Sequence, residues 1–286
     1  MNINLCIASR GHPVELLRVI EETDARVADT DLTTISVTLD DDDESVPAIP
    51  NTRCRLVWDI APREDSLGAK YNRCARNAPA DAYALGADDN IFAAEGWDEK
   101  IRETIGLFPE NFGFCYFGRL DGTLPTQMAI PHALIEAQGF LFPDHFPFWF
   151  HDTWTDEIAH MTGRIMWTDI AVEEIGGRGK TRGLREVPFW TALFDALHPE
   201  RERTAEKLST QFNPPWLDVQ LRQRRDILNL FFRDRLMRLR NPATAIHFER
   251  RMAYDEKPTE RYLRIKARAE ETMKDLARRT TAEAAA

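Results

Sequence analysis

The strongest chemical signal in the sequence is a pair of adjacent aspartates, Asp88 and Asp89, followed by Asn90. They come directly after residues 81–87, an apolar run typical of a buried strand. Neighbouring carboxylates repel each other, whereas a hard divalent cation binds carboxylate oxygens together with the phosphates of a substrate. We therefore predict that these three residues hold Mn²⁺ or Mg²⁺. The alternative is a polar turn in which Asp89 or Asn90 caps a following helix.

A second acidic run, Asp40–Glu44, follows the alternating apolar run at residues 33–39. Acidic side chains at strand ends accept hydrogen bonds from the ribose or base of nucleotides in dinucleotide-binding folds. Asp40 and Asp42 are therefore candidate nucleotide ligands. For the last two acids of the run we favour a solvated loop.

A third candidate, Asp152, lies among aromatic side chains at the start of a segment with helical pattern, residues 152–163. A carboxylate in an aromatic cleft can act as a general base toward a sugar hydroxyl. Asp156, one helical turn later, is the reserve candidate for this role. The alternative is an ordinary helix start, with Asp152 as the N-cap and Asp156 near the positive end of the helix dipole.

These carboxylates would be positioned by segments that alternate between strand-like and helix-like patterns. Such alternation predicts an α/β fold with a parallel sheet covered by helices on both faces. Ligands of such sheets bind at the carboxyl ends of strands, where both acidic runs lie. Strands are expected at residues 2–8, 33–39, 55–58 and 81–87, and helices are expected to begin at Pro13 and to span residues 66–77.

The middle of the chain, residues 106–150, is rich in Phe, Pro and Gly and gives weaker patterns. A strand is expected at residues 114–117 and a short helix at residues 131–138. A glycine-rich segment at residues 176–183 then separates the main body from the C-terminal part of the chain. Its basic side chains are consistent with either a lid over a diphosphate or a solvated connector; they are Arg178, Lys180 and Arg182.

Two amphipathic segments, residues 216–240 and 259–277, predict a helical C-terminal extension. We place this extension at residues 191–286, after a catalytic domain at residues 1–190. The arginines around the apolar stripe of the first segment leave three alternatives open. The helix lies on an anionic membrane surface as a peripheral contact, packs on the main body, or pairs with a second copy of the chain as a homo-oligomer.

Charge is distributed unevenly along the 286 residues. Residues 1–199 hold 17 basic and 33 acidic side chains, whereas residues 200–286 hold 20 basic and 14 acidic ones. The acidic body argues against nucleic-acid binding, because a phosphate backbone needs a basic face. No apolar run approaches the ~20 residues of a membrane span, and the first residues do not have the pattern of a secretory signal. With four widely spaced cysteines, a cytoplasmic protein with reduced thiols is expected.

The order of these segments, over roughly residues 3–185, resembles the GT-A fold of nucleotide-sugar-dependent glycosyltransferases, especially family 2-like members. The segment Ser9-Arg10-Gly11-His12-Pro13 looks like the turn after the first strand of that family, where the nucleotide lies. Leu67–Asn72 resembles the helix segment before the strand that ends in the family's Asp-x-Asp motif. Asp88-Asp89-Asn90 falls on that motif, with an asparagine at its third position, so that Asp89 is the alternative metal ligand.

The second half of the resemblance concerns the catalytic base. The family often carries a Glu-Asp pair followed by Thr, with a Gly eleven residues after the Asp. Here Asp152-Thr153 and Gly163 keep that spacing, and His151 takes the place of the Glu. Asp152 is thus the position similar to the family's base.

The resemblance implies a mixed, mainly parallel sheet with a nucleotide-binding half at about residues 1–90 and an acceptor half at about residues 91–190. It implies a reaction in which a sugar passes from a nucleoside-diphosphate sugar to a hydroxyl of a glycan or lipid-linked acceptor, with inversion and with Mn²⁺ or Mg²⁺. The implied donor ligands are Ser9, Arg10, Asp40, Asp42, Lys70, Asn72 and Asp88.

Two alternatives to this function remain open from the sequence. A nucleotidyltransferase can use a similar sheet and metal, although that class typically has a glycine-rich basic loop after its first strand, and the segment 9–13 is poor in glycine. A non-catalytic nucleotide- or glycan-binding module is the other alternative, and Asn90 in the metal motif is the feature that favours it.

Overall fold

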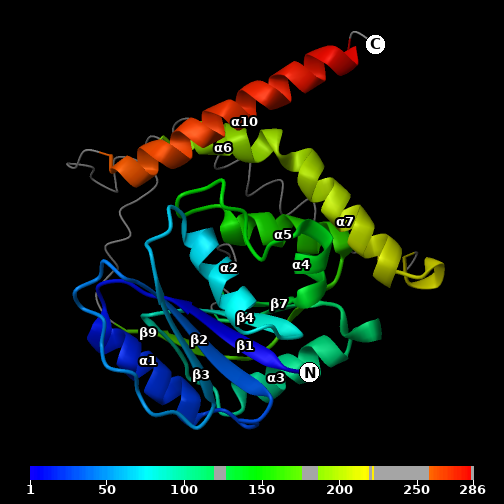
Figure 1. Ribbon diagram of the computed structural model, residues 1–286. Coiled ribbons are helices and arrows are strands. Elements are labelled where there is room, and N and C mark those ends of the chain that lie inside the picture. The colour runs from blue at the N-terminus through cyan, green and yellow to red at the C-terminus, as the bar shows by residue number, and fades with distance from the viewer. Residues whose placement is uncertain (119–126, 176–185, 219–220, 222–257, 285–286) are drawn as a thin grey trace.

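The computed structural model describes residues 1–118, 127–175, 186–218, 221 and 258–284 (Figure 1). Within these residues the chain forms a seven-stranded sheet with helices on both faces and a separate two-stranded sheet. The first six elements follow the alternation that the sequence predicts, and Pro13 opens the first helix as expected. They are β1 (Ile3–Ala8), α1 (Pro13–Ala25), β2 (Thr33–Asp40), β3 (Arg55–Ala61), α2 (Leu67–Asn77) and β4 (Ala82–Ala87).

The seven-stranded sheet is mixed and mainly parallel, as expected. Its strand order is β3-β2-β1-β4-β7-β6-β8, and the first four strands in this order are parallel. The carboxyl ends of these four strands therefore lie at one edge of the sheet. The short strand β7 (Met128–Pro131) runs antiparallel to both β4 and β6 (Phe114–Tyr116), and β8 (Ile165–Trp167) is parallel to β6.

The remaining elements include the strand and helices expected in the middle of the chain. The short helix expected at residues 131–138 is α4 (His132–Gln138), and the helix expected to begin at Asp152 is α5 (His151–Thr162). Most of the predicted helix at residues 216–240, and the glycine-rich segment with Arg178, Lys180 and Arg182, lie outside the described residues. The other elements are α3 (Trp97–Gly106), β5 (Asn90–Phe92), β9 (Val172–Glu174), α6 (Val187–Ala196), α7 (His198–Phe212), α10 (Glu260–Ala284) and a 3₁₀ turn at Pro109–Asn111.

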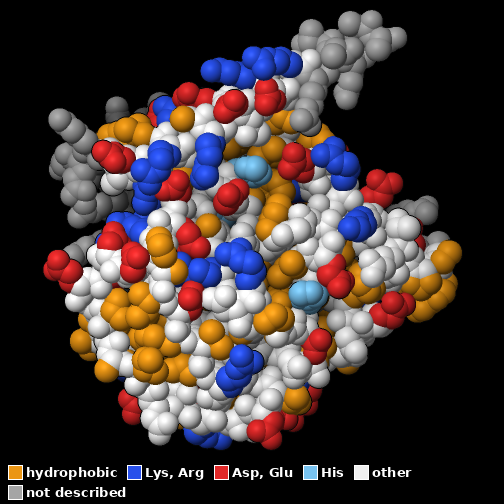
Figure 2. Space-filling model, viewed as in Figure 1, with side chains coloured by type: hydrophobic (Ala, Val, Ile, Leu, Met, Phe, Trp, Pro, Cys, Tyr) orange, Lys and Arg blue, Asp and Glu red, His pale blue; other side chains and the backbone are white. Residues whose placement is uncertain are grey.

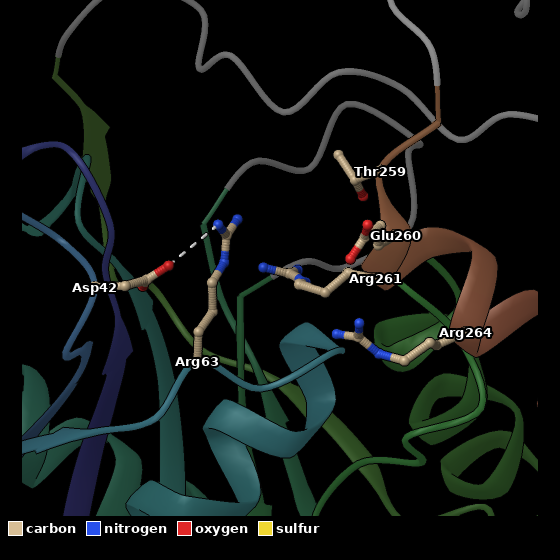
Figure 3. A pocket seen from close by; sticks show the side chains of 6 residues that line it. All are labelled: Asp42, Arg63, Thr259, Glu260, Arg261 and Arg264. Atoms are coloured by element: carbon tan, nitrogen blue, oxygen red, sulfur yellow. Dashed lines mark ion pairs between the residues drawn. The ribbon is translucent and has the colours of Figure 1, made fainter.

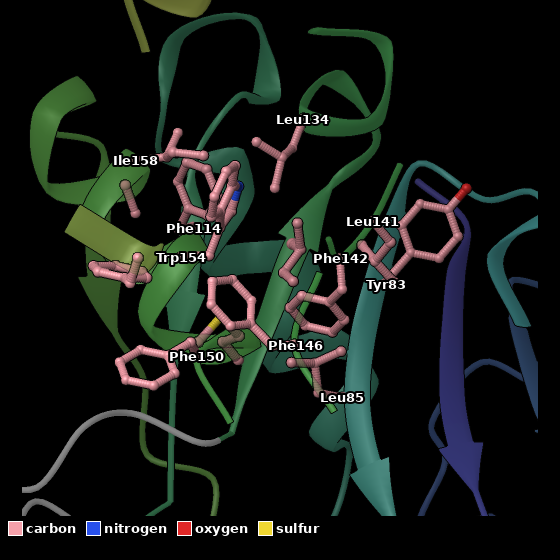
Figure 4. Close-up of a cluster of buried hydrophobic side chains, with 14 of the residues drawn as sticks. Tyr83, Leu85, Phe114, Leu134, Leu141, Phe142, Phe146, Phe150, Trp154 and Ile158 are labelled. Atoms are coloured by element: carbon pink, nitrogen blue, oxygen red, sulfur yellow. The ribbon is translucent and has the colours of Figure 1, made fainter. Parts of the chain in front are cut away.

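Helices cover both faces of the sheet (Figure 1), and each face has its own hydrophobic core. On one face α1 and α3 bury Leu16, Ile20 and Trp97 against the inward side chains of β1 and β2. On the opposite face α2, α4 and α5 cover an aromatic cluster around Phe146, part of which is shown in Figure 4. Because both faces are covered, a ligand can reach the sheet only at its edges.

The C-terminal helices belong to the second of these cores. Side chains of α6, α7 and α10 contribute to the same aromatic cluster as α5. Buried Arg201 of α7 pairs with Glu157 of α5 and lies over the Phe194 ring, with 3.7 Å from its guanidinium carbon to the ring centroid. Tyr262 of α10 receives a 3.1 Å hydrogen bond from the indole of Trp190. Among the described residues, no helix is long and apolar enough to span a membrane.

Candidate active site

Three chain segments meet at the carboxyl edge of the parallel strands. The turn after β1 carries Ser9 and Arg10, the end of β2 carries Asp40 and Asp42, and the end of β4 carries Asp88. Hydrogen bonds and ion pairs join their side chains directly. The acidic runs singled out in the sequence therefore form one site with the turn after β1.

Asp88 is held by the turn after β1. The Ser9 hydroxyl donates a 2.7 Å hydrogen bond to Asp88 Oδ2, and the Arg10 backbone N–H donates a longer one of 3.4 Å to the same oxygen. Burial raises the pKa of Asp88, and these hydrogen bonds oppose the rise. Burial also raises the pKa of Asp89, which the neighbouring charges of Asp88 and Glu174 raise further.

The residues after Asp88 and Asp89 do not form a helix. Asn90 begins the short strand β5, in which it pairs with Glu174 of β9. The alternative in which Asp89 or Asn90 caps a helix is therefore wrong, because the chain continues as a strand.

The chemistry of this acidic pair fits a hard divalent cation. Asp88 and Asp89 are adjacent, half-buried carboxylates, and the charge of Asp88 raises the pKa of Asp89, which is the repulsion that a bound cation relieves. Within the described residues no group of three or more His, Cys, Asp or Glu side chains is arranged to hold a metal. Two carboxylates are nevertheless a common protein contribution to Mg²⁺ when substrate phosphates supply other ligands.

Asp40 is the centre of a buried ionic cluster beside the acidic pair. It is 1% exposed, and its two oxygens lie 3.0 Å from Lys70 Nζ and 3.1 Å from Arg10 Nη1. Lys70 also donates a 2.9 Å hydrogen bond to the Ser9 carbonyl, so its side chain ties the ends of β1 and β2 together. Burial lowers the pKa of Lys70 even though Asp40 opposes the shift. The more exposed Asp42 pairs with Arg10 and lies 3.8 Å from Arg63.

Asn72, expected to contact the donor, has its side-chain amide engaged elsewhere. Its Oδ1 accepts hydrogen bonds of 2.8 and 2.9 Å from the N–H groups of Leu141 and Phe142, and its Nδ2 donates a 2.8 Å hydrogen bond to the Phe142 carbonyl. The side chain thus fixes the loop before α5 to α2.

Replacing Asn72 with alanine is expected to destabilise the protein without weakening nucleotide binding. The three hydrogen bonds would be lost and partly buried backbone groups left unpaired, at a cost of about 1–3 kcal/mol. Chemical denaturation measures the free energy of unfolding, and calorimetry measures nucleotide affinity. A large loss of nucleotide affinity at unchanged stability would instead show that Asn72 contacts the donor.

Asp152 lies in the first turn of α5. Its Oδ1 accepts a 2.8 Å hydrogen bond from the N–H of Thr153, and the residue is partly exposed. Burial raises the pKa of Asp152, and the nearby charge of Asp156 adds to the rise. Such a carboxylate is a stronger proton acceptor than an exposed aspartate.

Asp156 is placed differently from Asp152. It is 0% exposed, and its Oδ1 accepts a 2.8 Å hydrogen bond from the Tyr116 hydroxyl and lies 3.1 Å from Nδ1 of His160. An acceptor sugar cannot reach a carboxylate that is completely enclosed. Asp156 is therefore better placed to raise the pKa of Asp152 than to act as the base itself.

Helix α2 connects the acidic pair to the start of α5. Tyr71 donates a 2.7 Å hydrogen bond to the carbonyl of Gly86, two residues before Asp88. About one turn earlier on α2, a Cβ added to Gly68 would lie 2.7 Å from Cδ2 of His151, so only glycine permits this close approach. The segment Leu67–Asn72 thus joins the two halves of the site.

Sequence reasoning missed Arg63, Tyr71 and Glu174, all of which lie at the site. Arg63 follows β3 by two residues, so the rule that ligands meet at the carboxyl ends of strands would have found it. Glu174 and Tyr71 gave no such signal, because neither follows a strand of the parallel set.

Comparisons with known proteins agree with this architecture. No protein-family model matches the chain, and no curated protein sequence gives a match. Among solved structures, the chain is similar to residues 1–349 of Staphylococcus aureus TarS in complex with UDP-GlcNAc, with a TM-score of 0.55 and 9% identity over 88% of this chain and 90% of that one. It is also similar to the mannosyltransferase PcManGT of Pyrobaculum calidifontis in complex with GDP-Man and Mn²⁺, with a TM-score of 0.50 and 14% identity over 99% of this chain and 84% of that one.

At these identities the likeness concerns the fold. The mixed, mainly parallel sheet, its helices on both faces and the site at its carboxyl edge together give this chain the GT-A fold of nucleotide-sugar glycosyltransferases.

Proposed function

We propose that the chain is a metal-dependent glycosyltransferase that moves a sugar from a nucleoside-diphosphate sugar to an acceptor hydroxyl, with inversion at the anomeric carbon. The observation that carries the proposal is the junction of the adjacent carboxylates Asp88 and Asp89 with the ionic cluster of Arg10 and the buried Asp40 and Lys70, at the carboxyl edge of a GT-A sheet. The solved structures of similar fold that were determined with UDP-GlcNAc and with GDP-Man and Mn²⁺ support it.

The donor is held by the first half of the catalytic domain, about residues 1–90. Asp88 and Asp89 would hold Mn²⁺ or Mg²⁺, with Asn90 beside them, and the cation neutralises charge on the departing diphosphate when bound. Arg10 and Asp42 take the ribose and base, and the enclosed Asp40 acts through Arg10, which it holds in place. Lys70 acts through Asp40 and the Ser9 carbonyl, which it positions.

The second half, about residues 91–190, receives the acceptor and supplies the base. Asp152 takes the proton of an acceptor hydroxyl while that oxygen forms a bond to the anomeric carbon and the bond from this carbon to the diphosphate breaks. The proton ends on Asp152 and the electron pair leaves with the nucleoside diphosphate. Attack from the face opposite the diphosphate inverts the anomeric configuration. We propose as acceptor a hydroxyl group of a glycan or of a lipid-linked molecule.

The proposal is tested by calorimetry with UDP, GDP, ADP and CDP, each with Mn²⁺ and after removal of metal by EDTA. At least one nucleotide is expected to bind with metal and to lose most of its affinity without it. The diphosphate and the carboxylates of Asp88 and Asp89 are both anionic and repel each other when no cation lies between them. Transfer is then measured as nucleotide released from the matching sugar donor. If no nucleotide binds in the presence of Mn²⁺, the proposed function is wrong.

A further inference from the structure

A charged pocket lies between the parallel sheet edge and the last described helix, α10. Its volume is about 320 Å³, and Figure 3 shows three arginines, one from the loop after β3 and two from α10, directed toward the same space. The lining residues are Asp42, Arg63, Thr259, Glu260, Arg261 and Arg264.

The start of α10 is anchored beside this pocket by the loop after β3. Arg264 Nη2 lies 2.6 Å from Asp65 Oδ1, and Arg261 Nε donates a 3.3 Å hydrogen bond to the Asp65 carbonyl. On the other side of the helix, the Tyr262 hydroxyl donates a 2.8 Å hydrogen bond to Glu186. These contacts fix the position of Arg261 relative to the sheet edge.

Arg261 differs from its neighbour Arg264 in its charge balance. Within the described residues no carboxylate lies within ion-pair distance of the Arg261 guanidinium, whereas Arg264 is paired with Asp65. Burial lowers the pKa of Arg261, and the positive charge of Arg63 lowers it further. The charges of Asp40 and Asp65 oppose this lowering without cancelling it, whereas the hydrogen bond and charge of Asp65 raise the pKa of Arg264. A ligand with acceptor atoms would therefore supply the Arg261 guanidinium with partners that the described part of the chain does not.

The lining favours a nucleoside over a simple anion. Two carboxylates, Asp42 and Glu260, line the pocket together with the arginines, and they would repel a bare phosphate. Figure 2 shows the same mixture of acidic and basic side chains on the surface below α10. A nucleobase and its ribose present donors and acceptors side by side, and a guanidinium plane can both stack on a base and bind its acceptor atoms.

The pocket is continuous with the proposed donor site. The Arg10 side chain reaches Asp40 and Asp42, and Asp42 lines the pocket, whereas the Arg10 backbone N–H contacts Asp88. A nucleotide whose phosphates lie at the acidic pair would therefore have its nucleoside on the side of the pocket.

We infer that α10 forms a wall of the donor site and that Arg261 is a specificity-determining residue, which binds acceptor atoms of the donor's base or ribose. The inference rests on the proposed function and adds to it a role for the C-terminal extension. Asp65 and Arg264 are positioning residues, because their ion pair and the Asp65 carbonyl, which accepts a hydrogen bond from Arg261, hold Arg261 in place.

The test compares Arg261→Ala and Arg261→Lys with the unmodified chain, in calorimetric titrations with UDP, GDP, ADP, CDP and inorganic pyrophosphate, all with Mn²⁺. Arg261→Ala is expected to weaken the preferred nucleotide about tenfold or more, as for loss of a hydrogen bond to a charged group. Arg261→Lys keeps the charge without the planar fork and should recover only part of this loss. Pyrophosphate affinity should not change, because pyrophosphate lacks the nucleoside.

Arg278→Ala is the matched control, since Arg278 is an exposed arginine on the same helix. Unchanged nucleotide affinity in Arg261→Ala would overturn the inference, and so would an equal loss for nucleotide and pyrophosphate. If the unmodified chain binds pyrophosphate and nucleotides with equal affinity, the pocket does not contribute to binding of the nucleoside and the inference is wrong. If it binds no nucleotide at all, the proposed function fails and the inference fails with it.

The positioning role is tested by exchanging the ion pair. Asp65→Arg and Arg264→Asp are each expected to weaken the preferred nucleotide, and the double variant is expected to restore most of the affinity. A double variant whose loss of nucleotide affinity equals the sum of the two single losses would contradict the positioning role. Thermal unfolding of every variant confirms that the chain remains folded.

Discussion

Replacing Asp152 with asparagine is expected to reduce sugar transfer about 10²–10⁴-fold, the usual contribution of a positioned general base. Asparagine has nearly the same shape and can still accept the hydrogen bond from the Thr153 N–H, but it cannot take a proton. The affinity for the nucleotide should therefore stay the same. Initial rates of nucleotide release from the sugar donor, together with calorimetry, separate the two effects.

The same residue should set the acid limb of the pH profile. Burial raises the pKa of Asp152 above the usual value, so its base form is lost at a higher pH than that of an exposed aspartate. In the unmodified chain kcat/KM is expected to fall as the pH drops through this raised pKa, and this limb should be absent from the residual activity of Asp152→Asn. Asp169→Asn, which removes an exposed carboxylate, is the control. Full turnover in Asp152→Asn would show that another group is the base.

Replacing Asp88 with asparagine is expected to lower metal-dependent transfer about 100-fold or more, because a catalytic cation contributes several kcal/mol to stabilising the leaving group. Nucleotide affinity in Mn²⁺ should fall toward the value measured after EDTA treatment. Asparagine can still accept the Ser9 hydrogen bond, and removing one of two crowded carboxylates relieves repulsion. The metal-free variant should therefore unfold at no lower temperature than the unmodified chain.

The control for Asp88 comes from the second acidic run. Glu44 is exposed at the end of that run, and Glu44→Gln changes the net charge by the same amount. It is expected to leave nucleotide affinity, metal dependence and turnover unchanged. Equal losses in Asp88→Asn and Glu44→Gln would mean that general electrostatics, rather than a metal site, explains the effect.

The sequence predicts three of the four parallel strands from apolar runs, because β1, β2 and β4 are buried on both faces. β1, β2 and β4 appear where these runs predict them, and the two acidic runs follow β2 and β4 as expected. The antiparallel insertion of β7 between β4 and β6 was not predictable. Met128–Pro131 is only four residues long, and a strand that short has no periodicity to recognise.

The candidate site, like the fold, was predicted only in part from the sequence. Asp40 and Asp88 were predicted from the rule that ligands meet at the carboxyl ends of parallel strands, and Ser9 and Arg10 from the resemblance to the family's turn after its first strand. The structure brings these residues together. Arg261 gave no comparable signal, because its role depends on how a distant helix packs against the sheet. Tertiary contacts of this kind are not encoded in any local pattern.

The anchor between Asp65 and Arg264 joins positions 199 residues apart, and this separation determines the order in which the site is assembled. At about 5–20 residues per second, a ribosome takes on the order of ten seconds or more to pass from Asp88 to Arg264. The strands that carry the acidic runs can therefore pair before α10, which lines the charged pocket, has been synthesised. A nascent chain consequently has its parallel strands well before α10 completes the charged pocket.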